Sequence, residues 1–279
     1  MKTFNVDLKR EYSFLQGGRL DCVLTEYPYD DEKPENWALP AVIVVPGGGY
    51  GMVSKREGFP IATAFAAKGF QVFVLTYLCA PDEVRYPEQL LEEAAAVDYV
   101  KKNAKELLVN PNEVFLVGFS AGGHLVGNLA VEHQNIAQKA GVALDCKPTA
   151  VGLSYPVITK TNGHFGSYVN LLHGYSEEAQ EELLKTLNLD EAVNEQTPPA
   201  FIWATANDQV VPAHNALRYA LALAKQGIDY EIHVYPDGPH GLSTGNLDVN
   251  FSLTAQQQRT KRWVDDCAQF LHRYTVEVF

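Results

Sequence analysis

The sequence predicts an α/β protein with a mainly parallel central sheet that is covered by helices on both faces. Apolar, β-branched runs alternate along the chain with helical patterns, which indicates strand–helix–strand units. The middle runs are apolar at consecutive positions, as expected of strands that are buried on both faces. With 279 residues, of which 46% are apolar, the chain is long enough to bury a sizeable core.

The first half of the chain contains the earliest strands of this predicted sheet. The opening thirty residues alternate between apolar and polar, as in RLDCVLTEY, and predict antiparallel strands. Residues 41–45 form a buried strand that ends at three glycines, and 71–78 form the next one. A helical pattern that ends near Gly69 separates them. A long amphipathic helix over 86–108 then precedes a strand at 113–119.

The second half continues the alternation of strands and helices. A helix begins at Ala121, and a fourth apolar run covers 150–158. About forty mixed residues follow, with a helix predicted from Ser176. The last elements are strands at 199–206 and 230–236, the helix AHNALRYALALAKQG between them, and a closing helix at 254–274.

Four chemically distinctive groups follow strands of the predicted sheet. The glycines at 47–49, Ser120, Asp208 and His240 each come after a different strand. In parallel sheets the reactive groups gather at the carboxyl ends of the strands. We therefore expect these four groups to lie together at one edge of the sheet.

Ser120 lies in the pattern G-F-S-A-G, between a buried strand and a helix. A strand-to-helix turn this sharp leaves no room for side chains two residues away, so glycine is required at 118 and 122. The turn would lift the hydroxyl clear of the sheet as a nucleophile. A merely tight corner is the structural alternative, and the strand–turn–helix context favours the nucleophile.

A serine nucleophile needs a base, and the chain has eight histidines. His240 is the candidate, because its Gly/Pro turn after the last strand can swing the imidazole over a neighbouring strand end. His124, four residues past Ser120 on the same helix, is interpreted as structural, and the others as surface or core residues. Asp208 directly follows a strand and is the predicted carboxylate partner. Asp237 is the rival, and we interpret it as a turn former.

The glycine run and the residue after Ser120 complete the predicted site. Attack on an ester creates an oxyanion, which preplaced N–H groups must stabilise. The glycines at 47–49 let the backbone approach the substrate closely. The N–H of Ala121 lies at the start of a helix, where the helix dipole favours negative charge. A plain flexible turn is the alternative interpretation of the glycines.

These segments resemble the α/β-hydrolase fold, and more narrowly the bacterial carboxylesterase and acetylxylan-esterase-like group near the hormone-sensitive-lipase-like esterases. VVPGGGY resembles the HGGG oxyanion loop, GFSAGGHL the nucleophile elbow, TPPAFIWATANDQVVP the acid-bearing segment, and EIHVYPDGPHGL the histidine turn. The resemblance implies that Ser120 is the nucleophile, His240 the base and Asp208 the orienting acid. It also implies that the oxyanion donors are Gly48, Gly49 and Ala121.

One position departs from the pattern of these relatives. Pro46 stands where the HGGG loop begins with histidine, so other residues must supply the hydrogen bonds that brace the loop. Which of Gly48 and Gly49 donates to the oxyanion therefore stays open. In SKREGFP, which follows the loop, Arg56 and Glu57 could contact a polar alcohol such as a sugar, or form an exposed ion pair.

Residues 1–279 are expected to form one α/β-hydrolase domain with a small cap insertion at about 159–197. We expect the insertion to overhang Ser120 and aromatic side chains to line a small acyl pocket. The side chains predicted to contact substrate are Tyr50, Tyr155, Phe165 and Tyr168. Simple packing of the cap onto the body is the alternative role for these aromatic residues.

The combined pattern predicts a serine carboxylesterase that hydrolyses short-chain, acetyl-type esters through an acyl-enzyme intermediate. Acetylated sugars or xylo-oligosaccharides are candidate substrates, and the mechanism needs no metal or organic cofactor. A same-fold amidase, peptidase or arylformamidase is one alternative. A non-catalytic ligand-binding relative is the other, although such proteins typically lose a member of the triad.

Composition narrows the partners and the location. The net charge of −12 argues against nucleic-acid binding. No apolar run approaches the ~20 residues of a membrane span, and the opening residues lack the apolar core of a secretory signal. The four cysteines are widely spaced. We therefore expect a cytoplasmic protein with free thiols that acts on a small-molecule ester, and a homo-oligomer is compatible with the sequence.

Overall fold

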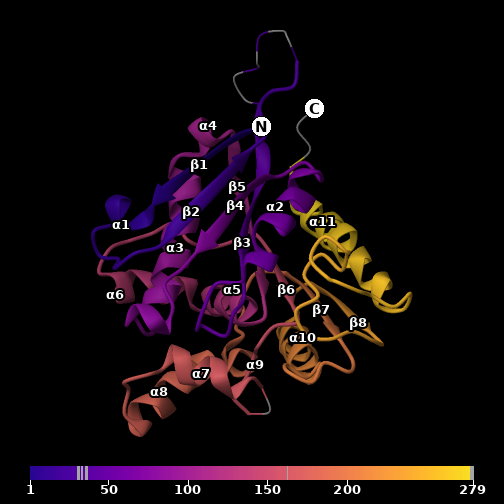
Figure 1. Cartoon of the computed structure of the whole chain (residues 1–279). Helices are drawn as coiled ribbons and strands as arrows, with labels where there is room; N and C mark the ends of the chain where they lie inside the picture. The colour runs from indigo at the N-terminus through magenta and orange to yellow at the C-terminus, as the bar shows by residue number, and fades with distance from the viewer. Residues whose placement is uncertain (30–31, 33, 35–36, 162, 277–279) are drawn as a thin grey trace.

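The computed structural model describes residues 1–276 except 30–31, 33, 35–36 and 162. Within this part of the chain, eight strands form one sheet in the order β1-β2-β4-β3-β5-β6-β7-β8 (Figure 1). The strands are β1 (Lys2–Asp7), β2 (Arg19–Leu24), β3 (Leu39–Val45), β4 (Gln71–Thr76), β5 (Val109–Phe119), β6 (Val151–Ser154), β7 (Ala200–Thr205) and β8 (Tyr230–Tyr235).

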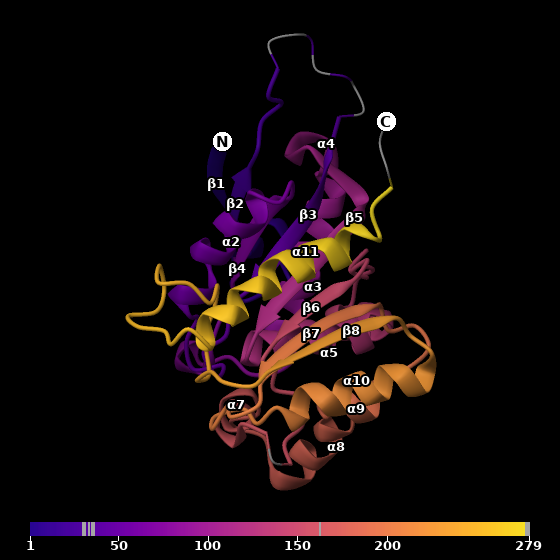
Figure 2. The same ribbon diagram turned by 90° about the vertical axis from the view of Figure 1, so that its right-hand side faces the viewer.

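The pairing of the strands confirms the predicted, mainly parallel sheet. β1 and β2 pair antiparallel, as do β2 and β4, and all further neighbours pair parallel. The carboxyl ends of β3 and of β5 to β8 consequently lie at one edge of the sheet, where parallel sheets place their reactive groups. Figure 2 shows α7 and the long loop after β8 at this side of the molecule.

Helices cover both faces of the sheet, as predicted. One face packs against α3, α5 and α10, and the other packs against α2 and α11. The helices are α1 (Leu8–Glu11), α2 (Phe59–Ala66), α3 (Glu88–Lys102), α4 (Ala104–Leu107), α5 (Ala121–Glu132), α6 (Ile136–Ala140), α7 (Phe165–Leu171), α8 (Glu177–Leu187), α9 (Leu189–Ala192), α10 (His214–Gln226) and α11 (Trp263–His272). In the described ranges no helix combines the length and apolar character needed to cross a bilayer.

Several elements differ from the sequence prediction at their ends. The helix predicted at 86–108 breaks at Asn103 into α3 and α4. β5 begins earlier than expected, because a register shift opposite β3 accommodates the Asn-Pro pair that precedes residue 113. β6 ends early, because Tyr155 turns the chain with a φ of 37°. The closing helix opens with a 3₁₀ segment, Gln257–Arg262, before α11.

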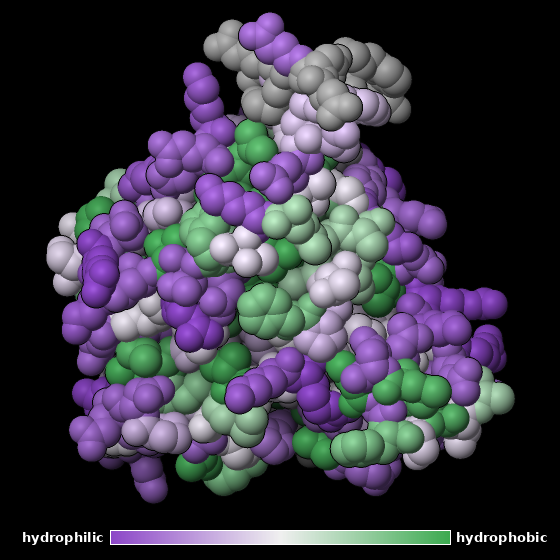
Figure 3. Space-filling model, turned by 45° about the horizontal axis from the view of Figure 1, so that its top comes forward, coloured by the Kyte–Doolittle hydropathy of each residue, from purple (hydrophilic) through white to green (hydrophobic). Residues whose placement is uncertain are grey.

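The segment between β6 and β7 holds α7, α8 and α9. α8 begins where the sequence predicts, because the side chain of Ser176 accepts a hydrogen bond from the N–H of Ala179 and caps the helix. α7 was not predicted, since its apolar residues show no clear helical repeat. On the face seen in Figure 3, hydrophilic residues surround smaller hydrophobic patches.

Candidate active site

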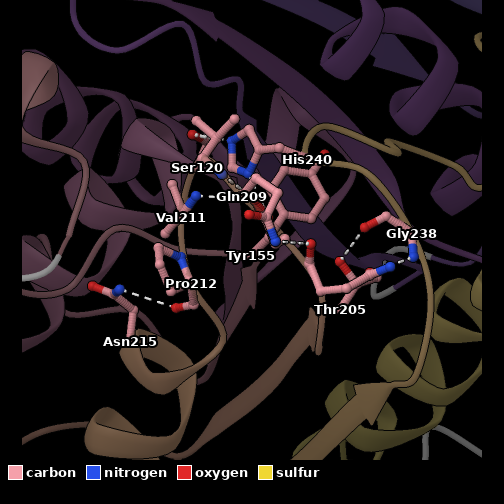
Figure 4. A network of polar contacts seen from close by, with 12 residues as sticks. Ser120, Tyr155, Thr205, Gln209, Val211, Pro212, Asn215, Gly238 and His240 are labelled. Atoms are coloured by element: carbon pink, nitrogen blue, oxygen red, sulfur yellow. Dashed lines mark hydrogen bonds and ion pairs between the residues drawn. The ribbon is translucent and has the colours of Figure 1, made fainter.

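The structure brings Ser120, His240 and Asp208 together at the carboxyl edge of the sheet. Figure 4 shows Ser120 and His240 side by side there. His240 Nε2 lies 2.8 Å from Ser120 Oγ, and His240 Nδ1 lies 2.7 Å from Asp208 Oδ2. A carboxylate can only accept, so Nδ1 carries the proton and Nε2 is left to accept from the serine hydroxyl. This is the hydrogen-bonded order that activates a serine nucleophile.

Asp208 rather than Asp237 is the carboxylate beside the histidine. The Asp208 side chain is completely buried, and its second oxygen accepts hydrogen bonds from the N–H groups of Val210 and Val211 at 2.8 and 3.0 Å. Asp237 instead accepts from Asn207 Nδ2 at 2.6 Å, within an exposed turn. The fixed carboxylate of Asp208 therefore orients the imidazole and stabilises it when protonated.

The turn at Ser120 has the strained backbone that the sequence predicts. Ser120 has a φ of 54°, a region that non-glycine residues rarely adopt. A β-carbon on Gly118 would lie 2.3 Å from the carbonyl oxygen of Gly122, and one on Gly122 would lie 2.2 Å from that of Val45. The two glycines thus let β5 and α5 pack closely enough to hold the hydroxyl at the end of the strand.

The three predicted oxyanion donors lie around this hydroxyl in the fold. Gly48 and Gly49 line a cavity with Ser120, and Ala121 is the first residue of α5. In the described part of the chain, the amides of these three residues donate no hydrogen bond to another protein group. A β-carbon on Gly48 would lie 2.0 Å from the carbonyl oxygen of Met52, so the loop path requires glycine there. Free amides beside the nucleophile are what an oxyanion needs.

The glycine loop is braced by side chains that replace the missing histidine at Pro46. Glu57 is buried and accepts from the Gly47 N–H at 2.9 Å. Tyr77 donates its hydroxyl to the carbonyl of Pro46 at 2.8 Å, and Asn170 Nδ2 donates to the carbonyl of Gly49 at 2.8 Å. Of the two interpretations of Glu57 from the sequence, the exposed ion pair is wrong, because its carboxylate is buried and faces inward to the loop.

Glu57 also connects the glycine loop to the environment of His240. Its second oxygen accepts from the Tyr155 hydroxyl at 2.7 Å, and that hydroxyl accepts from the N–H of Ser243 at 3.0 Å. The Tyr155 ring packs edge-on against His240, with 5.0 Å between the ring centroids. One buried carboxylate therefore holds the loop on one side of Ser120 and the support of His240 on the other.

We expect Glu57→Gln to lower kcat for ester hydrolysis by about tenfold or more, with a smaller change in KM. Glutamine keeps the size but cannot accept from both Gly47 and Tyr155, so the loop shifts, and loss of one oxyanion donor alone costs about 10²–10³ in rate. Steady-state kinetics test this expectation. Glu88→Gln is the matched control, since Glu88 is equally buried and accepts from the N–H of Gln16 far from the site. Equal losses of kcat in both variants would contradict this role of Glu57.

None of the four aromatic side chains predicted to contact substrate lines the catalytic cavity. That cavity has a volume of about 380 Å³ and is lined by Gly48, Gly49, Met52, Ser54, Arg56, Glu57, Ser120, His164, Gly166, Asn170, Val210, His240 and Gly241. Tyr50, Tyr155 and Tyr168 are buried, and their hydroxyls bond to His124, Glu57 and the Leu187 carbonyl. Phe165, the first residue of α7, is 64% exposed instead. The three tyrosines thus support the site from behind, and direct contact of the four aromatic residues with substrate stays a prediction.

His164 and Asn170 line the cavity, although sequence reasoning gave neither a role there. His164 lies just before α7, and its Nδ1 is 2.9 Å from Ser167 Oγ. Partial burial and the nearby His240 lower the pKa of His164. Neither residue directly follows a strand, so the sequence does not indicate a place at the site. Tertiary packing of the segment between β6 and β7 brings both residues there. The described residues include no group of three His, Cys, Asp or Glu side chains arranged to hold a metal ion.

His124 has the structural role predicted for it. The ring is buried, with Nε2 2.9 Å from the Leu187 carbonyl and Nδ1 2.8 Å from the Tyr50 hydroxyl. Because a carbonyl can only accept, Nε2 carries the proton and Nδ1 accepts from Tyr50. Burial lowers the pKa of His124 to about 4. The neutral imidazole therefore connects the residue after the glycine loop to the end of α8.

We expect His124 to make the protein lose stability as the pH falls from 6.5 towards 4. The pKa of His124 is about 4 in the folded protein and about 6.5 when unfolded, so the unfolded chain takes up the proton first. The stabilisation is complete above pH 6.5, and roughly 3 kcal/mol of it is lost by pH 4. Urea unfolding at several pH values should show a shallower dependence for His124→Gln. The exposed His272→Gln is the control, and identical profiles for His124→Gln and wild type would refute this expectation.

Comparisons with known proteins match most of the chain. The model of the BD-FAE family matches residues 29–223. The endo-1,4-beta-xylanase B of Butyrivibrio fibrisolvens is 33% identical over 87% of this chain and 38% of its own length. The acetylxylan esterase of Xylanibacter ruminicola is 31% identical over 76% of this chain and 43% of its own length. The chain thus spans about two fifths of these curated relatives.

A solved structure resembles the whole arrangement. The acetyl ester-xyloside bifunctional hydrolase of Caldicellulosiruptor lactoaceticus superposes with a TM-score of 0.76 at 30% identity, covering 92% of this chain and 88% of that one. Together with the strand order described above, this similarity confirms the predicted α/β-hydrolase fold.

Proposed function

Because the chain belongs to the BD-FAE family, we propose that it is a serine carboxylesterase that hydrolyses short-chain acyl esters through an acyl-enzyme intermediate. The observation that carries this proposal is the continuous hydrogen-bonded order from Ser120 Oγ through His240 to Asp208. A serine hydroxyl is a weak nucleophile, and a base held 2.8 Å away by a buried carboxylate gives it the activation that acyl transfer requires.

The reaction has two halves. His240 Nε2 takes the proton from Ser120 Oγ as that oxygen attacks the acyl carbon, and the same proton then passes to the departing alcohol. Water next attacks the acyl-enzyme while His240 accepts its proton, and the carboxylic acid is released as Ser120 regains a hydrogen. In both halves the amides of Ala121 and of the glycine loop receive the negative charge on the former carbonyl oxygen.

Several features favour acetyl esters of a polar alcohol as substrates. The catalytic cavity of about 380 Å³ is small and combines the polar side chains of Arg56, His164 and Asn170 with the apolar Met52 and Val210. Such a lining suits a compact acyl group next to an alcohol that carries hydroxyls. Among the relatives, one is named an acetylxylan esterase and a solved one an acetyl ester-xyloside hydrolase, so acetylated xylo-oligosaccharides are the proposed natural class.

We expect kcat/KM for p-nitrophenyl esters to be highest for acetate or propionate and to fall steadily with chain length. The cavity must hold the alcohol as well as the acyl group, and His164 and Asn170 face Ser120 across it, so we expect a long acyl chain to be crowded there. A maximum at octanoate or longer would overturn the short-acyl proposal. p-Nitroacetanilide and N-formylarylamines, assayed in parallel, test the amidase and arylformamidase alternatives, and faster turnover of either than of the acetate ester would favour them.

We also propose that the protein acts in the cytoplasm on a small-molecule ester. The four cysteines are free and buried, as is usual for proteins of a reducing compartment. The net charge of −12 favours neutral substrates over nucleic acids. Immunoblotting of cell fractions tests this location, and recovery of the protein mainly outside the cytoplasmic fraction would contradict it.

A further inference from the structure

A second cavity adjoins the catalytic one and shares Arg56 with it. It has a volume of about 610 Å³ and is lined by Lys55, Arg56, Pro60, and the loop residues 247–252. Arg56 lines both cavities, so its side chain forms the partition between them. A substrate that passes Arg56 can therefore occupy the two cavities at once.

In ester cleavage the leaving alcohol lies on the side of Ser120 that faces this second cavity. The departing alcohol receives its proton from His240 Nε2 and must lie on the His240 side of Ser120. Gly241 follows His240 and lines the catalytic cavity there. A β-carbon on Gly241 would lie 3.9 Å from Arg56 Nη1, so the glycine and the guanidinium are neighbours. The alcohol part of the substrate thus extends past Gly241 and Arg56.

The wall of the second cavity is held in place by hydrogen bonds, although it is an irregular loop. Arg56 donates from Nε to the Val249 carbonyl at 3.0 Å and from Nη2 to Asn250 Oδ1 at 2.9 Å. Asn250 Nδ2 in turn donates to the carbonyls of Leu242 and Asn246 at 3.0 and 2.8 Å. Long loops without secondary structure inside a compact fold are commonly functional. The bonds fix the loop that carries the next residue, Phe251.

The lining has the character of a carbohydrate site. Phe251 is completely exposed at the cavity, and together with Leu247, which is 66% exposed, it gives the lining an apolar patch. Lys55, Asp248 and Ser252 supply donors and acceptors beside it. Both signs of charge are present, which favours a neutral polyol over an anion. A sugar ring has an apolar C–H face that packs on an aromatic ring and hydroxyls that hydrogen-bond to polar side chains.

We propose that this second cavity is a glycosyl subsite that holds the sugar units beyond the one carrying the reacting ester. The inference rests on the proposed esterase function and deepens it, since it assigns an oligosaccharide rather than a simple alcohol to the leaving side. The Phe251 ring stacks on the second or third sugar, and Arg56 separates that sugar from the reacting one.

Specificity ratios measure the subsite directly. The probes are acetylated xylotriose, acetylated xylose and p-nitrophenyl acetate, with release of acetate or nitrophenol as the readout. We expect the wild type to favour the trisaccharide over the monosaccharide by about tenfold in kcat/KM, a typical effect of one aromatic stacking contact. Phe251→Ala should abolish this preference through a higher KM, and Phe251→Trp should retain it. Because Phe251 is fully exposed, its replacement leaves the fold intact.

The control variant is Tyr230→Ala, which removes an exposed aromatic ring at the first residue of β8, at the opposite end of the strand from the site. It should keep the wild-type ratio. If Phe251→Ala keeps the wild-type ratio of kcat/KM between trisaccharide and monosaccharide, the subsite proposal is wrong. If this variant also changes its oligomeric state, as measured by light scattering, Phe251 contacts a second copy of the chain instead. If the wild type hydrolyses none of the three acetates, the proposed function itself fails, which is a distinct result.

Discussion

Replacing Ser120 by alanine is expected to lower kcat for acetyl ester hydrolysis by about 10⁵ to 10⁶, the loss seen when a serine nucleophile is removed from a triad. In the proposed mechanism this hydroxyl forms the acyl-enzyme, and among the described residues no other hydroxyl is hydrogen-bonded to His240. Alanine lacks only one oxygen, so the turn between β5 and α5 should keep its packing. Initial rates with p-nitrophenyl acetate, together with a thermal unfolding curve, measure both effects.

The matched control is Ser54→Ala, which removes another hydroxyl from the same cavity. Its loss of rate should be far smaller than that of Ser120→Ala, because in the described structure His240 is hydrogen-bonded to Ser120 and His164 to Ser167, not to Ser54. If Ser120→Ala keeps a rate close to wild type, Ser120 is not the nucleophile and the proposed mechanism is wrong.

Asp208→Asn is expected to lower kcat by about 10⁴ while the fold stays intact. Asparagine fills the same buried space, and its carbonyl oxygen still accepts from Val210 and Val211. Its amide, however, either presents a donor to His240 Nδ1 and forces the wrong tautomer or leaves the ring unsupported. The nucleophile then faces an N–H instead of a lone pair. Rates across the pH range above neutrality measure the loss.

Asp237→Asn provides the comparison at the rival position. Asp237 is half-buried and bonds to Asn207 away from His240, so its replacement should change the rate only slightly. A loss of several orders of magnitude in Asp237→Asn, with a small effect in Asp208→Asn, would show that the orienting acid has been misassigned.

Sequence reasoning predicted those parts of the site that local signals encode. Ser120 and Asp208 each come after an uninterrupted apolar run, which predicts that a strand ends there. The Gly and Pro residues around His240 predict a turn. Glycine is needed at 118 and 122 because a β-carbon at either position would lie less than 2.5 Å from a backbone oxygen. For Gly118 that oxygen is in the same turn, and for Gly122 it is in β3. Because parallel strands share one carboxyl edge, these local signals were sufficient to place the three side chains together.

The surroundings of the triad could not be predicted in the same way. Tyr50 and Tyr168 are aromatic residues of the kind that often line pockets. In the structure, however, the Tyr50 hydroxyl bonds to His124 and the Tyr168 hydroxyl bonds to the end of α8. The charged segment SKREGFP predicts a surface position for Glu57. In the structure the glycine loop packs against Glu57, whose buried carboxylate accepts a hydrogen bond from Gly47. His164 comes to the cavity from the cap, whose placement depends on long-range packing. Sequence periodicity records neither the direction of a side chain nor such contacts.

Active-site labelling with a fluorophosphonate tests the central claim most directly. The reagent phosphonylates an activated serine, and mass spectrometry of the intact protein and its peptides locates the adduct. The proposed triad predicts one adduct per chain on the peptide that contains Ser120, none in Ser120→Ala, and much slower labelling in His240→Ala. An unlabelled wild-type protein, or an adduct on a different serine, would contradict the assignment of Ser120 as the activated nucleophile.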